Sequence, residues 1–157
     1  MTVEIIRDVI SEKESAIIVA DLLDFAPEIA TNSLHLDLED GFQYLDYLPN
    51  IHIPDLGYLI GRYAVTMNGQ GWYPGDTWHT DGTADEVSVL LYLSGDNSQG
   101  GDFLTRTSHN QFELNSLFVF DSSVEHYVTP YTSSVPRIAF KWRYKKKVDQ
   151  LLGPLFY

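Results

Sequence analysis

Short apolar segments separated by turn residues occupy the chain from about residue 58 onward, and they limit the folds that it can adopt. Glycine, proline and asparagine mark the turns between them. Such spacing is typical of a β-sandwich or jelly roll, and it differs from the alternation of strands and helices in a parallel α/β sheet. We predict strands over residues 58–67, 86–93, 117–120, 127–130 and 138–144, and a strand or strand-like approach over residues 72–79.

The first third of the chain is predicted to support this region. Ser11 and Glu14 make a capping box at the start of a helix, and Pro27 ends the helical pattern. Residues 3–6 fit a short edge strand. We therefore expect a mainly β fold with flanking helices (α+β) and a jelly-roll, or double-stranded β-helix, core. Residues 1–157 would form one domain, with 58–144 as the core and 1–57 as a supporting segment that packs its helix against the sheet.

Charge and composition exclude several classes of function. Ten basic and 22 acidic residues give a net charge of −12, and an acidic surface does not suit nucleic-acid binding. The basic run Lys145-Lys146-Lys147 is interpreted as a solvated terminal segment. Because there is no cysteine, a bound metal must be held by imidazole and carboxylate groups. The chain shows no signal peptide and no bilayer-spanning apolar stretch, so we expect a soluble, cytoplasmic protein without a membrane partner.

The triplet His79-Thr80-Asp81 is the main candidate for chemistry. Residues two apart on a strand point to the same side, so the imidazole of His79 and the carboxylate of Asp81 can bind the same metal ion. His126, from a later strand, would complete a set of two histidines and one carboxylate, which suits Fe(II) with open coordination positions. Arg137 is the residue type expected to bind a carboxylate through paired N–H donors.

A second triplet of the same form, His35-Leu36-Asp37, is interpreted differently. Leucines alternate with its polar residues, which places His35 and Asp37 on the solvent face of an amphipathic strand. No later histidine stands in a comparable relation to this pair. We therefore do not expect His35 and Asp37 to bind a metal.

An ordered set of motifs lies between about residue 58 and residue 144. These are His79-Thr80-Asp81, Leu91-Tyr92-Leu93, Gly100-Gly101-Asp102-Phe103-Leu104, Leu117-Phe118-Val119-Phe120-Asp121, His126-Tyr127-Val128-Thr129-Pro130 and Arg137. Through this set the region resembles the 2-oxoglutarate and Fe(II)-dependent oxygenases, in particular the prolyl 4-hydroxylase-like branch. The resemblance implies a double-stranded β-helix with a metal at one open end.

The resemblance also implies a role for each site residue. His79, Asp81 and His126 would bind Fe(II), and 2-oxoglutarate would chelate the metal while its far carboxylate meets Arg137 and Tyr92. With dioxygen, such a site hydroxylates a C–H bond of a small-molecule or peptide substrate, with a prolyl residue and a free amino acid as candidates. Two aromatic residues, Tyr73 and Trp78, are candidates for the substrate cleft.

Other interpretations stay open on the sequence alone. Tyr92 also fits simple core packing, and Arg137 fits a surface ion pair. The site also fits a metal-binding jelly roll without turnover, which would act in binding or structure, or a vestigial triad. One feature departs from the family, which often has an aromatic residue an even number of positions after the basic one, whereas Trp142 follows Arg137 by five. Either a bulge intervenes, or Trp142 packs outside and Lys141 points into the barrel.

Overall fold

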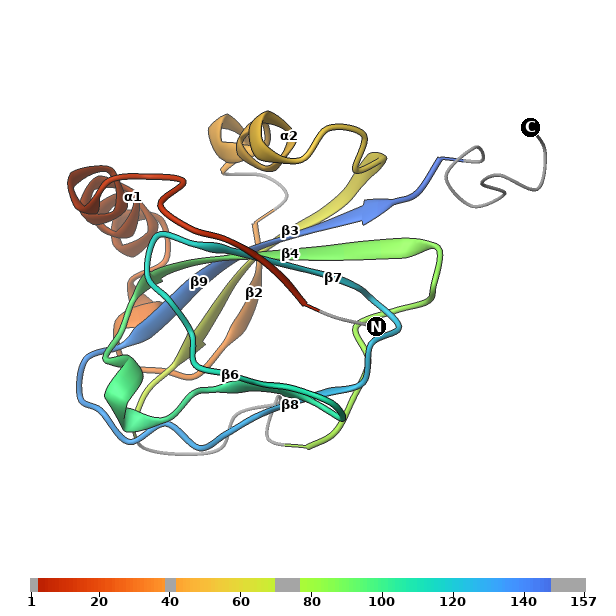
Figure 1. Cartoon of the computed structure of the whole chain (residues 1–157). Helices are drawn as coiled ribbons and strands as arrows, with labels where there is room; N and C mark the ends of the chain where they lie inside the picture. The colour runs from red at the N-terminus through yellow and green to blue at the C-terminus, as the bar shows by residue number, and fades with distance from the viewer. Residues whose placement is uncertain (1–2, 39–41, 70–76, 148–157) are drawn as a thin grey trace, which may run out of the picture.

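The computed structural model describes residues 3–38, 42–69 and 77–147 and consists of two antiparallel β-sheets with helices outside the larger one (Figure 1). The larger sheet has the strand order β1-β7-β4-β9-β3-β2, and the smaller one has the order β6-β5-β8. The strands are β1 (Glu4–Ile6), β2 (His35–Asp37), β3 (Tyr58–Met67), β4 (Glu86–Ser94), β5 (Phe103–Thr105), β6 (His109–Asn110), β7 (Leu117–Asp121), β8 (His126–Val128) and β9 (Arg137–Lys145). The predicted mainly β jelly roll is thereby confirmed.

The strands that the sequence predicts are also found. β3, β4, β7, β8 and β9 match the predicted segments, with ends that differ by at most two residues, and β1 lies at an edge of the large sheet. The expected strand over 72–79 falls partly outside the described residues. Of its described part, His79 forms a single antiparallel bridge with His126.

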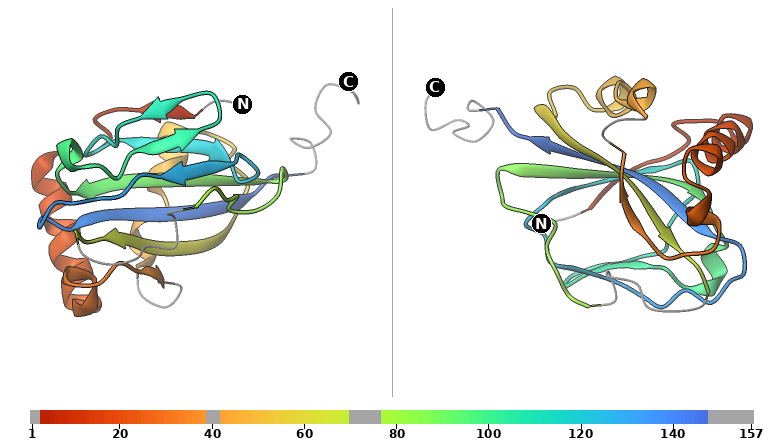
Figure 2. Two further views of the ribbon diagram at one scale, coloured as in Figure 1. Left: turned by 90° about the horizontal axis from the view of Figure 1, so that it is seen from below. Right: turned by 180° about the vertical axis from the view of Figure 1, so that it is seen from behind.

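Helices cover one face of the large sheet, as the view from behind makes clear (Figure 2). Helix α1 (Glu12–Phe25) begins at the predicted capping box, because the Ser11 hydroxyl accepts from the Glu14 N–H and the Ser11 N–H donates to the Glu14 carboxylate, both at 3.1 Å. The helix ends before Pro27. The shorter helical elements are η1 (Pro27–Ala30), η2 (Gln43–Leu45), α2 (Leu48–His52) and η3 (Asn97–Gln99). None of the helices in the described part of the chain is long and apolar enough to span a bilayer.

Strand β9 separates two cores, because its side chains alternate strictly between the two faces of the sheet. Its even-numbered residues from Ile138 to Tyr144 pack with the helices. On the opposite face Ala139 belongs to the core between the two sheets, and Arg137, Lys141 and Arg143 line a cavity there. Of the two interpretations of the Arg137–Trp142 spacing, the second is therefore correct: Trp142 packs outside the barrel and Lys141 points inside.

Replacing Trp142 with alanine should lower the free energy of unfolding by about 3–5 kcal/mol, because it empties a fully buried site beside Phe140, whose ring centroid lies 4.5 Å away. Urea unfolding measures this loss. Trp142→Phe is the matched control: it keeps a ring and removes an indole N–H that has no hydrogen-bond partner among the described residues, so it should cost clearly less. A loss below about 1 kcal/mol for alanine would contradict this assignment of Trp142 to the helix-side core.

Candidate metal centre

Backbone pairing brings the predicted metal ligands together. His79 and His126 exchange two backbone hydrogen bonds of 2.9 Å, so the segment that contains His79 runs beside β8. Two residues further on, the N–H groups of Asp81 and Gly82 both donate to the Ser122 carbonyl at 2.9 Å. These bonds fix the turn after His79 and aim the Asp81 carboxylate at the two imidazoles.

The three side chains have the geometry and the tautomers of a metal site. One ligand atom from each of His79, Asp81 and His126 lies within 4.8 Å of the others. The Nδ1 atoms of His79 and His126 lie 2.7 and 2.9 Å from the carbonyl oxygens of Thr77 and Val124. Because a carbonyl only accepts, both Nδ1 atoms carry a proton, so each Nε2 atom is the ring nitrogen left to bind a metal. The donor set of two neutral imidazoles and one carboxylate fits Fe(II).

Aromatic packing holds His126 in place. Its imidazole is nearly fully buried and stacks on the Phe103 ring, with 4.8 Å between centroids and 17° between planes, while the Phe120 ring meets it edge-on. His79 is more open, with 32% of its side chain exposed. One side of the triad is therefore rigid and dry, and the other side faces the opening.

Lys141 forms an ion pair with Asp81 inside the cavity. The Lys141 Nζ lies 2.9 Å from Asp81 Oδ2, and both side chains are less than 10% exposed. The other carboxylate oxygen, Oδ1, faces the Nε2 atoms of His79 and His126, at 3.8 and 3.4 Å. Burial raises the pKa of Asp81, but hydrogen bonds and charge from His126 and Lys141 outweigh it and hold that pKa well below its usual range. The carboxylate is thus kept ionised, as a metal ligand must be.

Arg137 lies deep in the barrel and is not a surface ion pair. It is 2% exposed, and its guanidinium carbon lies 4.9 Å from the centroid of the Tyr92 ring and 5.1 Å from that of Phe112. Arg137 makes one long contact, 3.5 Å, to the Tyr92 hydroxyl, and its Nε has no hydrogen-bond partner among the described residues. Burial raises the pKa of Tyr92 against the lowering effect of Arg137, so the phenol keeps its proton and can donate.

The paired glycines of the sequence make room for this arginine. Gly101 has a φ of +72°, and a Cβ at this position would lie 2.8 Å from Arg137 Cδ. Gly100, with a φ of +91°, passes so close to the Pro130 carbonyl that no side chain fits. The glycines therefore permit close approach of the turn before β5 to the buried guanidinium.

One cavity of about 270 Å³ is lined by both the predicted metal ligands and Arg137. Its lining combines apolar side chains with several charged ones. The lining residues are His35, Tyr63, Val65, His79, Thr80, Asp81, Leu90, Phe103, His126, Val128, Arg137, Ala139, Lys141 and Arg143.

His35 lies on the exposed side of β2, where the sequence placed it. Its ring also packs on Tyr63, with 4.6 Å between centroids, and it is one of the residues that line the cavity. The group of candidate metal ligands among the described residues consists of His79, Asp81 and His126. The position of His35 at the cavity was not predicted, because it follows from the pairing of β2 with β3, where His35 lies beside Val65.

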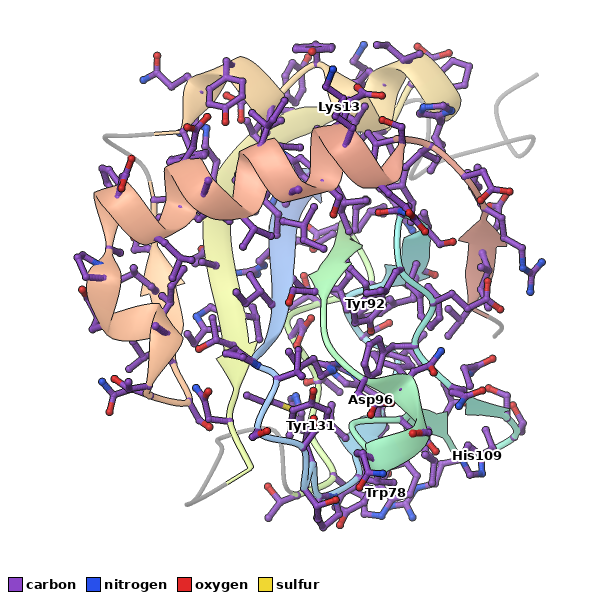
Figure 3. The ribbon with its side chains drawn as sticks, turned by 90° about the vertical axis from the view of Figure 1, so that its left-hand side faces the viewer. Lys13, Trp78, Tyr92, Asp96, His109 and Tyr131 are labelled. Atoms are coloured by element: carbon purple, nitrogen blue, oxygen red, sulfur yellow. The ribbon has the colours of Figure 1, made fainter. Side chains whose placement is uncertain are left out.

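One of the two predicted substrate residues, Trp78, is not among the residues that line the described cavity. Trp78 lies near the edge of the molecule beyond the small sheet, whereas Tyr92 lies between the sheets (Figure 3). The Trp78 ring packs beside Tyr127 at 5.7 Å and under the Arg106 guanidinium at 3.8 Å. Tyr73 lies outside the described residues. Sequence reasoning gave Lys141 only as an alternative and missed Arg143 as a cavity residue.

No family model and no curated protein matches this sequence. Solved structures do match. The viral collagen prolyl hydroxylase of Paramecium Bursaria Chlorella virus-1, in complex with 2-oxoglutarate, has a TM-score of 0.68 at 15% identity over 94% of this chain and 97% of that chain. A prolyl hydroxylase of Trichoplax adhaerens, in complex with a hypoxia inducible factor peptide fragment, gives 0.68 at 17% identity, over 96% and 86% of the two chains.

A third match is HygX from Streptomyces hygroscopicus with nickel and 2-oxoglutarate bound, at a TM-score of 0.68 and 11% identity over 93% of this chain and 82% of that chain. These likenesses extend over almost the whole chain at low sequence identity. They confirm the resemblance at the level of the fold: the chain has the jelly roll of the prolyl 4-hydroxylase-like oxygenases.

Proposed function

We propose that this chain is a non-haem Fe(II) and 2-oxoglutarate-dependent oxygenase that hydroxylates a C–H bond. One observation carries the proposal: a three-ligand metal site and the buried Arg137 guanidinium line the same cavity, and no carboxylate among the described residues neutralises that guanidinium. A metal site with a purely structural role needs no buried cation beside it. A co-substrate that chelates the metal and carries a second carboxylate uses both features.

Solved structures of the same fold support the choice of cofactors. The viral prolyl hydroxylase is a 2-oxoglutarate complex, HygX holds nickel and 2-oxoglutarate in one structure, and HygX holds iron in another. In this chain His79, Asp81 and His126 would hold Fe(II). Arg137 would bind the far carboxylate of 2-oxoglutarate through paired N–H donors, with the Tyr92 hydroxyl as a further donor.

The bound metal supplies the oxidation chemistry, in which dioxygen and 2-oxoglutarate are consumed and succinate and carbon dioxide leave. The protein's own residues orient the reactants and exclude water. The carbonyls of Thr77 and Val124 fix the imidazole tautomers, and Lys141 holds Asp81 ionised. Val65, Leu90, Phe103 and Val128 give the cavity apolar walls.

The substrate is proposed to be a small molecule or a peptide. Two of the neighbouring structures are prolyl hydroxylases, one of them with a bound peptide, which supports a prolyl residue or a free amino acid as the candidate. Tyr73 and Trp78 stay predicted substrate contacts, and we propose that residues 1–157 act as one domain.

The test is an anaerobic titration with Fe(II) and 2-oxoglutarate. The iron chelate of 2-oxoglutarate has a weak visible charge-transfer band, so we expect this band to appear and to saturate with 2-oxoglutarate. Metal binding without a band would instead indicate a non-catalytic metal-binding module. No metal binding at all would indicate a vestigial site.

A further inference from the structure

We propose that Lys141, with Arg143 and His35 beside it, forms a subsite for a carboxylate of the substrate. The substrate would then be a small carboxylic acid, such as a free amino acid, rather than an internal residue of a peptide. This inference rests on the proposed oxygenase function and names the substrate class of that site.

The cationic residues are arranged along one strand. Arg137, Lys141 and Arg143 occupy alternating positions of β9, and all three line the cavity. Arg137 and Lys141 lie roughly 13 Å apart along the strand, at about 3.3 Å per residue. Because Lys141 contacts Asp81, a co-substrate that runs from the triad to Arg137 leaves the Lys141–Arg143 half of the cavity to another molecule.

That half of the cavity contains hydrogen-bond donors that the protein leaves unused. The Lys141 ammonium has three N–H donors, of which one reaches Asp81, and no second acceptor for it is found among the described residues. The Arg143 Nε is buried and has no hydrogen-bond partner in the described part of the chain, although the same guanidinium pairs with Glu86. Unused buried donors favour an acceptor from outside the chain.

The charge balance gives the sign of the missing group. Among the charged residues at the cavity, Asp81 offsets Lys141 and Glu86 offsets Arg143, which leaves the positive charge of Arg137. Fe(II) brings two positive charges and 2-oxoglutarate two negative ones, so the loaded cavity keeps one positive charge. Once Asp81 shares its charge with the metal, this excess lies at Lys141. A carboxylate group there would pair with this local positive charge, whereas a neutral peptide segment brings no negative charge to it.

The size and walls of the cavity fit a small molecule. Its volume of about 270 Å³ must hold 2-oxoglutarate as well as the reacting part of the substrate. The rings of His35 and Tyr63 pack together at a tilt of 39°, and the Lys141 Nζ lies 5.8 Å from the centroid of the Tyr63 ring. Burial, and then the charge of Lys141, lower the pKa of His35, so its ring is neutral and adds a hydrogen-bonding group without a further charge.

The test uses the whole chain loaded anaerobically with Fe(II) and 2-oxoglutarate. Each common L-amino acid is titrated in parallel with its C-terminal amide, and the shift of the visible band is followed. We expect at least one amino acid to perturb the band at a concentration about ten- to a hundredfold lower than its amide does. This factor is the expected cost in affinity of losing one charge-assisted hydrogen bond, because the amide has no negative charge to pair with Lys141. Acids and amides with equal effects, or no response to any acid in a protein that shows the band, would overturn the subsite. Absence of the band would instead reject the proposed function.

Two variants test whether Lys141 causes the preference for an amino acid over its amide. Lys141→Met removes the charge at similar length and should reduce the acid-to-amide preference to about one, while Lys141→Arg should retain most of it. Lys145→Met is the matched control, because it removes a cation of the same strand that pairs with Asp85 outside the cavity. If Lys141→Met weakens Fe(II) binding and leaves the preference intact, Lys141 only positions Asp81 and the subsite is refuted.

Discussion

Replacing Asp81 with alanine is expected to abolish the charge-transfer band and to weaken Fe(II) binding by more than about a hundredfold. Removing a residue that only orients a metal ligand already lowers affinity by about ten- to a hundredfold, and Asp81 is proposed to be a ligand itself. The change also removes the only anionic ligand of the triad, so two neutral imidazoles would face a divalent cation. Isothermal titration with Fe(II) under anaerobic conditions measures the affinity.

The same substitution should lower stability by roughly 3 kcal/mol, because it leaves the Lys141 ammonium buried without its partner. The double variant Asp81→Ala with Lys141→Met should regain most of that stability and still bind Fe(II) as weakly as Asp81→Ala alone. Asp121→Ala is the matched control, since it deletes a carboxylate that pairs with Lys146 away from the triad. Fe(II) affinity that survives Asp81→Ala in a folded protein would show that the ligand assignment is wrong.

Local signals in the sequence were sufficient for most of the fold. The capping box at Ser11 starts α1, and apolar runs bounded by turn residues give β3 and β9 nearly to the residue. These features depend on neighbours in the sequence, and the physics that produces them is local. The helix therefore begins where predicted.

Side-chain orientation was harder to predict because it depends on which sheet face is covered. β9 carries large apolar residues on one face and cations with Ala139 on the other, so alternation alone did not decide between Trp142 and Lys141. His35 shows a related difficulty on an edge strand: it is exposed as predicted, but the sequence did not show that it also borders the cavity. The orientation of the β9 side chains and the position of His35 on β2 both depend on the strands that pair with them, which are far away in the sequence.

The grouping of the three proposed metal ligands was predictable for a different reason. His79 and Asp81 are held together by strand geometry, and His126 is brought in by one backbone bridge. The ion pair between Lys141 and Asp81 joins a turn to a strand on the other sheet, and no spacing rule connects them. The residues proposed to bind the metal therefore follow from motifs, whereas those proposed to select the substrate depend on tertiary packing.

Replacing Arg137 with methionine should raise the 2-oxoglutarate concentration at half-saturation of the charge-transfer band by about thirtyfold or more. Deleting one partner of a buried, hydrogen-bonded charge pair costs at least that much in affinity. Fe(II) affinity should stay nearly constant, because Arg137 contacts Tyr92 and Phe112 rather than the triad. Tyr92→Phe, which removes one neutral donor, should have a smaller effect of the same kind.

Arg137→Met should lower the affinity for 2-oxoglutarate without lowering the stability of the protein that has no co-substrate bound. Arg137 is 2% exposed, and its Nε is unpaired among the described residues, so an apolar side chain of similar length should leave the free energy of unfolding unchanged or raise it. Arg62→Met, which breaks a 2.7 Å ion pair with Asp46 outside the cavity, should leave 2-oxoglutarate binding unchanged. Equal losses of metal and 2-oxoglutarate affinity in Arg137→Met would show that Arg137 supports the fold of the triad. A selective loss with gained stability would show that this arginine is kept for its ligand.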